Sequence, residues 1–152
     1  MEENNLTKFF NKYIKGTPYK ATVEYNKTLI CSIDDISVYI STLSLKHLFD
    51  KKPAEEFHFI LDYLHLIVEW PDKIYENKSD KRGNLCFVKE IKNSEYICSV
   101  EKMSDKELQI VTAFRLRDND YIKSYTLLWN RGNGKPHRHA IDSLGESIDA
   151  PQ

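Results

Sequence analysis

Residues 85–91 read Leu-Cys-Phe-Val-Lys-Glu-Ile, and two further apolar runs follow at 96–102 and 108–114. Each run mixes apolar and polar side chains in alternation and contains β-branched or aromatic residues, which is typical of a strand with one buried face. Only short polar segments separate the three runs, and short connections favour antiparallel neighbours. This stretch therefore predicts a small antiparallel sheet.

An amphipathic segment ahead of these runs predicts a helix. Between Phe57 and Val68, apolar side chains recur at intervals of three and four residues, which places them on one face of a helix. Pro53 suits the first turn and Pro71 ends the helix, because proline disfavours a helical residue before it. A shorter helix is expected over 45–50. Helices followed by an antiparallel sheet make an α+β fold.

The N-terminal part predicts a β-hairpin. Its arms are 19–25 and 28–33, which alternate in polarity, and residues 26–27 supply the turn. Residues 36–41 alternate again and are interpreted as a third short strand. The sheet would therefore have an additional hairpin at its N-terminal side.

Composition favours one folded domain, assigned to residues 1–130. The chain has 152 residues, of which 41% are hydrophobic and 30% charged, and such a composition supports a core. Residues 131–152, rich in Gly, Pro, His, Asp and Ser, are expected to be a mobile polar tail. The chain has no apolar run of membrane-spanning length, its acidic and polar first residues do not resemble a secretory signal, and its three cysteines lack metal-ligand spacing. A cytoplasmic protein with reduced thiols and no membrane association is expected.

The charge is unevenly distributed along the chain. The net charge of −1 argues against a general nucleic-acid binder. Residues 115–139, however, hold six basic and two acidic side chains, a local excess of +4 that leaves −5 for the remainder. This basic segment would either contact phosphate or be a solvated surface, and charge patterning leaves both interpretations open.

Two polar side chains occupy positions where the strand alternation calls for apolar ones. Lys89 would share a face with Phe87, and Thr112 would share a face with Ile110. Arg115 would project to the opposite face unless a bulge at the strand end redirects it. A buried ammonium needs an anion or access to water, so Lys89 marks either a site or the edge of the sheet.

These residues, with His47, form a set suited to phosphodiester chemistry. RNA carries its own nucleophile, the 2′-hydroxyl, so a histidine that transfers protons and a lysine that stabilises charge can cleave it without a metal. A threonine hydroxyl can hydrogen-bond a non-bridging oxygen. Each residue also has an ordinary explanation: an exposed histidine, a lysine reaching past a strand edge, and a β-branched residue that suits a strand.

A zinc site is a weaker alternative. His58, Asp62 and His65 lie at helical spacing, but three ligands on one helix without a fourth make a poor site, and helical ion pairs explain them equally well. The sequence has no phosphate-binding loop and no dinucleotide-binding glycine pattern, so no cofactor is predicted. Residues 137–139, His-Arg-His, are expected to be solvated.

Five short motifs in this order carry a family resemblance: Ile-Ser-Thr-Leu-Ser-Leu-Lys-His at 40–47, Trp-Pro-Asp-Lys-Ile-Tyr at 70–75, Phe-Val-Lys-Glu-Ile at 87–91, Ile-Val-Thr-Ala-Phe at 110–114 and Leu-Leu-Trp at 127–129. In these motifs the chain resembles the barnase–EndoU–colicin–RelE-like nucleases, in particular their phage and mobile-element branch. The resemblance covers about residues 36–129. It implies helices followed by a small antiparallel sheet, and metal-independent RNA cleavage that leaves a cyclic phosphate.

The resemblance also implies roles for single residues. His47 would be the acid or base, Lys89 a charge stabiliser and Thr112 a phosphate contact, with Arg115 and Tyr125 as weaker candidates. The matched region has no clear second active-site histidine, so the partner of His47 in proton transfer stays open.

We therefore expect a toxin-like or phage-derived endoribonuclease that acts on a structured RNA such as a tRNA. The resemblance further implies an inhibitor or antitoxin protein as a partner. The alternatives are a non-catalytic module that binds protein or RNA on the same fold, and a metal-dependent hydrolase built on His58 and His65.

Overall fold

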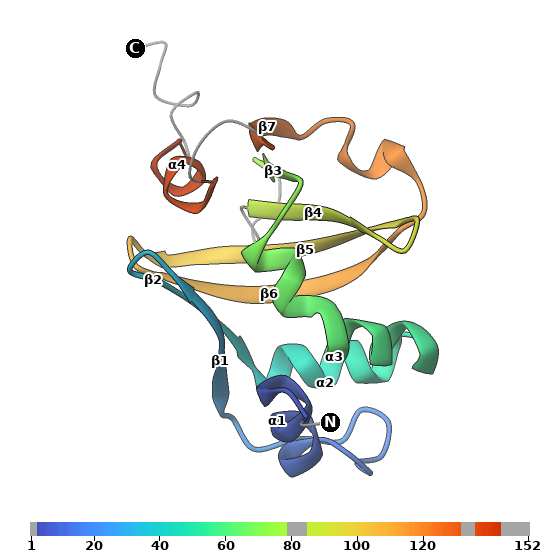
Figure 1. Ribbon diagram of the computed structural model, residues 1–152. Helices are drawn as coiled ribbons and strands as arrows, with labels where there is room; N and C mark the ends of the chain where they lie inside the picture. The colour runs from blue at the N-terminus through green and yellow to red at the C-terminus, as the bar shows by residue number, and fades with distance from the viewer. Residues whose placement is uncertain (1–2, 79–84, 132–135, 144–152) are drawn as a thin grey trace.

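The computed structural model of the protein describes residues 3–78, 85–131 and 136–143 (Figure 1). The α-helices in these ranges are α1 (Asn5–Tyr13), α2 (Thr42–Lys51), α3 (Ala54–Glu69) and α4 (Pro136–Ser143). The strands are β1 (Lys27–Ile33), β2 (Ile36–Ser41), β3 (Lys73–Glu76), β4 (Leu85–Ile91), β5 (Ser94–Ser104), β6 (Glu107–Leu116) and β7 (Thr126–Asn130). A short 3-10 helix, Asn119–Ile122, lies between β6 and β7. No helix within these ranges has the length and apolar character needed to cross a membrane.

The strands form one mixed sheet in the order β1-β2-β6-β5-β4-β3-β7. Strands β2 and β6 pair in parallel, whereas the other neighbours are antiparallel. The α+β class is confirmed, but the sheet is larger than predicted and is not purely antiparallel. Sequence periodicity identifies strands but not their partners, and β2 reaches β6 only after α2, α3 and three strands have intervened.

The central strands agree closely with the sequence analysis. Strand β4 has the predicted bounds, and β5 and β6 extend the other two predicted strands by a few residues. Lys92 and Asn93 join β4 to β5 and both have positive φ, 51° and 69°. Two such residues in a two-residue loop match the twist of an antiparallel hairpin.

The N-terminal hairpin is displaced from its predicted position. Its arms are β1 and β2, and Asp34 with Asp35 forms the turn. Residues 19–25, predicted as the first arm, contain no strand. Together with the adjoining residues they form a segment that we call the strap (residues 18–26).

Side chains of α2 bind the backbone of the strap. The Thr42 hydroxyl accepts the N–H of Asn26 at 3.0 Å and donates to the carbonyl of Glu24 at 2.7 Å. Lys46 donates to the carbonyl of Pro18 at 2.7 Å. Because α2 supplies these partners, the strap follows the helix instead of pairing with a strand.

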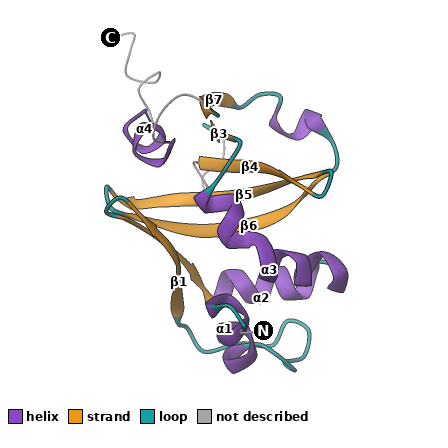
Figure 2. Ribbon diagram, viewed as in Figure 1, coloured by secondary structure: helices purple, strands orange, loops and turns teal. Residues whose placement is uncertain are grey.

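Helix α3 forms the centre of the main core. Its apolar stripe is buried as the periodicity predicted, and Phe57, Ile60, Leu64 and Ile67 are at most 2% exposed. Figure 2 shows α1, α2 and α3 grouped on one side of the curved sheet, with α4 apart from them. The packing of α3 against β4, β5 and β6 positions the side chains described in the next section.

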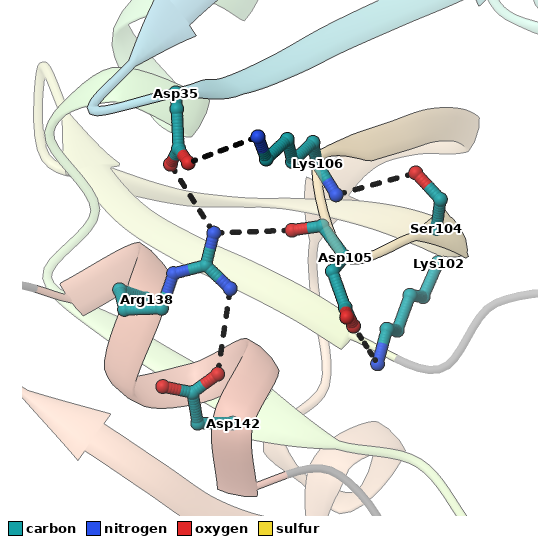
Figure 3. A network of polar contacts seen from close by, with 7 residues as sticks. All are labelled: Asp35, Lys102, Ser104, Asp105, Lys106, Arg138 and Asp142. Carbon is teal, nitrogen blue, oxygen red and sulfur yellow. Dashed lines mark hydrogen bonds and ion pairs between the residues drawn. The ribbon is translucent and has the colours of Figure 1, made fainter.

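The segment expected to be a mobile tail contains α4. Within it, His137 is 2% exposed, although it was expected to be solvated, and Ala140 and Ile141 belong to the main core. Arg138 contacts both neighbouring turns of the sheet, donating to Asp35 at 3.3 Å and to the carbonyl of Asp105 at 3.1 Å (Figure 3). The sequence did not predict this helix because its apolar residues are few, and its contacts join segments far apart in the chain.

The buried ion pair between Lys46 and Asp50 is expected to contribute measurably to stability. Their side chains are 7% and 9% exposed and lie 2.8 Å apart. Substituting Lys46→Ala would leave the Asp50 carboxylate buried without its cation, at a cost of about 3 kcal/mol. Urea unfolding measures this loss, and Lys51→Ala on the exposed side of α2 is the matched control, expected within about 0.5 kcal/mol of wild type. Equal stabilities of the two variants would contradict the prediction.

Stability is also expected to decrease under mildly acidic conditions because of His137. Burial lowers the pKa of this imidazole from its usual 6.5, although the Val68 carbonyl, which accepts the Nε2–H, and the charges of Asp34 and Glu69 act in the opposite direction. The unfolded chain therefore binds a proton more readily than the folded one, and the free energy of unfolding falls as the pH drops below about 6.5.

Unfolding measured between pH 8 and pH 5 tests this expectation. His137→Gln should show a shallower dependence on pH than wild type. The exposed His139 on the same helix provides the control, since His139→Gln should keep the wild-type slope. An unchanged slope in His137→Gln would show that this imidazole is not the responsible group.

Candidate active-site cleft

A β-bulge in β6 determines which side chains of this strand reach which face of the sheet. Val111 is the extra residue, because the register with β5 shifts between Ile110 and Thr112. An extra residue reverses the alternation of side chains beyond it. Accordingly, Ile110 and Ala113 both belong to the main core although three positions separate them.

The bulge corrects the predicted grouping of polar residues. Lys89, Tyr96 and Arg115 stand directly across from one another on β4, β5 and β6, and thus share the face that carries the main core. Thr112 is on the opposite face, so Lys89 and Thr112 do not share a surface. Arg115, predicted to point away if the strand were regular, joins Lys89 instead.

An open cleft lies where the start of α3 meets the start of β5 and the end of β6. It encloses about 500 Å³ including its mouth. Its lining residues are Pro53, Glu55, Glu56, Phe59, Tyr96, Arg115 and Arg117. Of the five residues predicted to form the site, only Arg115 lines this cleft.

Two aromatic rings form one wall of the cleft. Phe59 of α3 stacks on Tyr96 of β5 with ring centroids 4.4 Å apart and an interplanar angle of 13°. Burial raises the pKa of the Tyr96 phenol, while the charges of Arg115 and Glu56 act in opposite directions. The phenol therefore keeps its proton at neutral pH and remains a hydrogen-bond donor.

Two arginines and two glutamates line the polar wall of the cleft, and Glu56 is the glutamate that bonds to both arginine residues. Glu56 accepts the backbone N–H of Arg115 at 3.1 Å and the Nη2 of Arg117 at 2.5 Å. Burial by itself raises the pKa of Glu56, but the hydrogen bonds from Arg117 and Arg115 and the charges of Arg117 and Lys52 outweigh it and lower the pKa. The carboxylate is thus ionised at neutral pH. The guanidinium of Arg115 forms no hydrogen bond or ion pair with the residues that the structure describes.

Lys89 lies on β4, at the opposite end from Arg115 of the row of residues that Tyr96 connects. Its ammonium donates to the carbonyl of Trp70 at 2.7 Å and lies 3.8 Å from the Asp72 carboxylate. Asp72 also accepts the N–H of Glu90 and pairs with Arg131. Lys89 therefore joins the end of α3 to β4, which satisfies the requirement for an anion that the sequence indicated.

His47 is exposed on α2, on the side away from the buried Leu45 and Leu48. Across the described ranges its ring has no hydrogen-bond, ion-pair or aromatic partner. It lies about 6 Å along the helix axis from Lys51, the last residue of α2, and Pro53 two residues later lines the cleft. His47 is therefore outside the cleft lining, on the helix that leads to its rim.

Thr112 and Tyr125 lie away from the cleft. Thr112 stands across from Ser99, which in turn stands across from Cys86 of the smaller core cluster. Tyr125 packs against that same cluster, and its hydroxyl accepts a hydrogen bond from Asn77 at 3.1 Å. The structure thus divides the predicted set between two faces of the sheet.

Sequence reasoning missed Glu56, Phe59, Tyr96 and Arg117. Glu56 and Phe59 are three residues apart, as are neighbours on one helix face, and Arg117, just past the end of β6, follows Arg115 at the spacing of side chains on one strand face. These spacings are visible in the sequence, but nothing in the sequence indicates that the helix face and the strand end meet. For the zinc alternative, the described ranges contain no group of three or more His, Cys, Asp or Glu side chains arranged to hold a metal ion.

Comparison with protein families agrees with the resemblance in the motifs. The model of the family phage-Barnase-EndoU-ColicinE5/D-RelE like nuclease 3 matches residues 17–123. No curated protein and no solved structure gave a significant match. The family match includes the strap, which the short motifs did not reach, and ends before Tyr125. The chain belongs to this nuclease family.

Proposed function

We propose that this member of the phage-Barnase-EndoU-ColicinE5/D-RelE like nuclease 3 family is a metal-independent endoribonuclease that binds an RNA phosphate in the cleft. The observation that carries the proposal is the pair of arginines, Arg115 and Arg117, beside the stacked rings of Phe59 and Tyr96. Guanidinium groups match the geometry of phosphate oxygens. The phenol of Tyr96 adds a neutral donor.

Arg115 is the principal phosphate ligand in this proposal. Its backbone N–H donates to Glu56, while its guanidinium forms no hydrogen bond or ion pair with the described residues. Arg117 contributes its remaining N–H donors, since Nη2 donates to Glu56 and Nη1 donates to the carbonyl of Arg115. Such fixed donors stabilise the charge that develops on the phosphoryl oxygens during cleavage.

The proposed reaction uses the nucleophile of RNA itself. The 2′-oxygen attacks phosphorus as its proton is removed, and the bond to the 5′-oxygen breaks as that oxygen gains a proton. The products are a 2′,3′-cyclic phosphate and a 5′-hydroxyl end. This step needs groups that move protons and groups that stabilise charge, but it does not need a metal.

We assign proton transfer to His47, as the resemblance implies. Three facts support the assignment: the imidazole is exposed, it has no bond to another described residue, and α2 leads from it to the cleft rim at Pro53. Both side chains must act on one phosphodiester, so we place the scissile phosphate at the cleft rim near Pro53, between Arg115 and His47. Lys89 and Thr112 are not part of the proposed site, because their contacts and orientation place them elsewhere.

The proposed substrate is a structured RNA such as a tRNA, because the low net charge disfavours indiscriminate binding. A toxin-like role and an inhibitor protein as partner are proposed from the resemblance, and a cytoplasmic location is proposed from the free cysteines. A non-catalytic RNA-binding module would use the same cleft without His47.

Purified protein is expected to cleave RNA in the presence of EDTA. Incubation of total RNA, followed by end-group analysis, should give fragments with 2′,3′-cyclic phosphate and 5′-hydroxyl ends. DNA of matched sequence should stay intact, because it lacks the 2′-hydroxyl. Activity that disappears with EDTA and returns with a divalent cation would contradict the metal-independent mechanism, whereas binding without cleavage would favour the non-catalytic module.

Two substitutions should separate phosphate binding from proton transfer. Arg115→Ala should lower kcat/KM about 10²–10³-fold by removing a charge-stabilising donor, and should weaken binding of an uncleavable 2′-O-methyl RNA. His47→Ala should lower kcat about 10²–10⁴-fold and leave that binding unchanged. The measurement is single-turnover cleavage combined with fluorescence titration.

Two matched controls accompany these variants. Lys8→Ala removes an equal positive charge from an exposed position on α1, and His139→Ala removes an exposed histidine on α4. Both should behave as wild type. Full activity of His47→Ala would show that proton transfer comes from another group, and full activity of Arg115→Ala would exclude the cleft as the phosphate site.

A further inference from the structure

We propose that Glu56 is a positioning residue whose buried carboxylate holds the end of β6 and directs Arg115 and Arg117 into the cleft. This inference rests on the proposed function, because it assumes that the two arginines bind phosphate there. It adds Glu56, a residue of α3, to the proposed site. Removing this carboxylate should impair RNA binding, although the carboxylate and the RNA phosphate are both negatively charged.

The two carboxylate oxygens of Glu56 bind two different groups. Oε2 accepts the backbone N–H of Arg115 at 3.1 Å, and Oε1 accepts Nη2 of Arg117 at 2.5 Å. The Glu56 side chain is 6% exposed, whereas that of Arg117 is 59% exposed. A buried carboxylate therefore anchors an exposed arginine.

The backbone of β6 needs such a partner at this point. Strand β2 pairs with β6 only as far as Ile110, so the later residues of β6 face no strand on that side among the residues that the structure describes. Glu56 supplies the acceptor for the N–H of Arg115, and Arg117 returns to the carbonyl of Arg115 at 3.3 Å. The backbone of Arg115 is thus held at both its N–H and its C=O, and the guanidinium is left for the cleft.

Charge alone predicts a different role for Glu56. Glu55 and Glu56 both line the cleft with Arg115 and Arg117, so removing either carboxylate makes the cleft more positive. If the carboxylates acted only through charge, both removals would strengthen anion binding. A positioning role gives the opposite sign for Glu56, because its loss releases the two arginines. The neighbouring exposed Glu55 therefore serves as a matched control.

The experiment measures binding of a fluorescein-labelled 2′-O-methyl RNA oligonucleotide to the full chain. Glu56→Gln should weaken binding about tenfold or more, as expected when a hydrogen bond to a charged group is lost. Glu55→Gln should bind as well as wild type or more tightly. Tighter binding by Glu56→Gln, or a loss of equal size in both variants, would overturn the positioning role.

A second pair of variants tests the link to Arg117. In an Arg117→Ala background, Glu56→Gln should cause a smaller further loss than it does in wild type, because the two side chains act through one contact. Glu56→Asp keeps the charge and shortens the side chain. A positioning role predicts weaker RNA binding by this variant, whereas a role through charge alone predicts no change in binding. Fully additive losses would overturn the link.

Folding and catalysis are controlled separately. Melting curves identify the folded variants. If Glu56→Gln does not fold, Arg117→Ala, which changes an exposed side chain, should still weaken RNA binding more than Lys8→Ala does. Equal RNA binding by Arg117→Ala and Lys8→Ala would overturn the inference. RNA that is bound but not cut by wild type would refute catalysis while the comparison of Glu55 and Glu56 still decides the positioning. Failure of wild type to bind the oligonucleotide would refute both.

Discussion

The extra residue Val111 in β6 is the constraint on which the arrangement of the cleft depends. Because it reverses the alternation of side chains, the last part of the strand presents Arg115 to the side that carries α3. A regular strand would place Thr112 there instead. The position of the bulge coincides with the point where β2 stops pairing with β6, so the strand is free to change its twist there.

The second determinant is the approach of α3 to the free part of β6. The helix buries its apolar stripe against the central strands, which brings its first turn to the end of β6. Glu56 then completes the hydrogen bonding of a strand that has lost its neighbour. Phe59, one helical turn later, stacks on Tyr96 of β5. One helix face therefore supplies a residue to each wall of the cleft, Glu56 to the polar wall and Phe59 to the aromatic wall.

Polar contacts between residues distant in sequence join the helices to the strap and to the sheet. Thr42 and Lys46 bind the strap to α2, and Lys89 joins the end of α3 to β4. Arg138 bonds α4 to two turns of the sheet (Figure 3). In each case the polar atoms belong to residues distant in sequence. The same property explains why Lys89 was interpreted as a site residue: an ammonium in a strand needs a partner, and the sequence does not show where that partner lies.

The sequence by itself determined the α+β class, the extent of α3 and the three central strands, because apolar periodicity is a local property of the chain. Its motifs also indicated the nuclease family that the family match now establishes. Only the tertiary structure decided the mixed pairing of the sheet, the displacement of the hairpin, the folding of α4 and the reversal at Val111. These depend on which segments meet, and on a single unpaired residue that leaves the local pattern of polarity almost unchanged. The cleft beside Arg115 could therefore not be assembled from spacing alone.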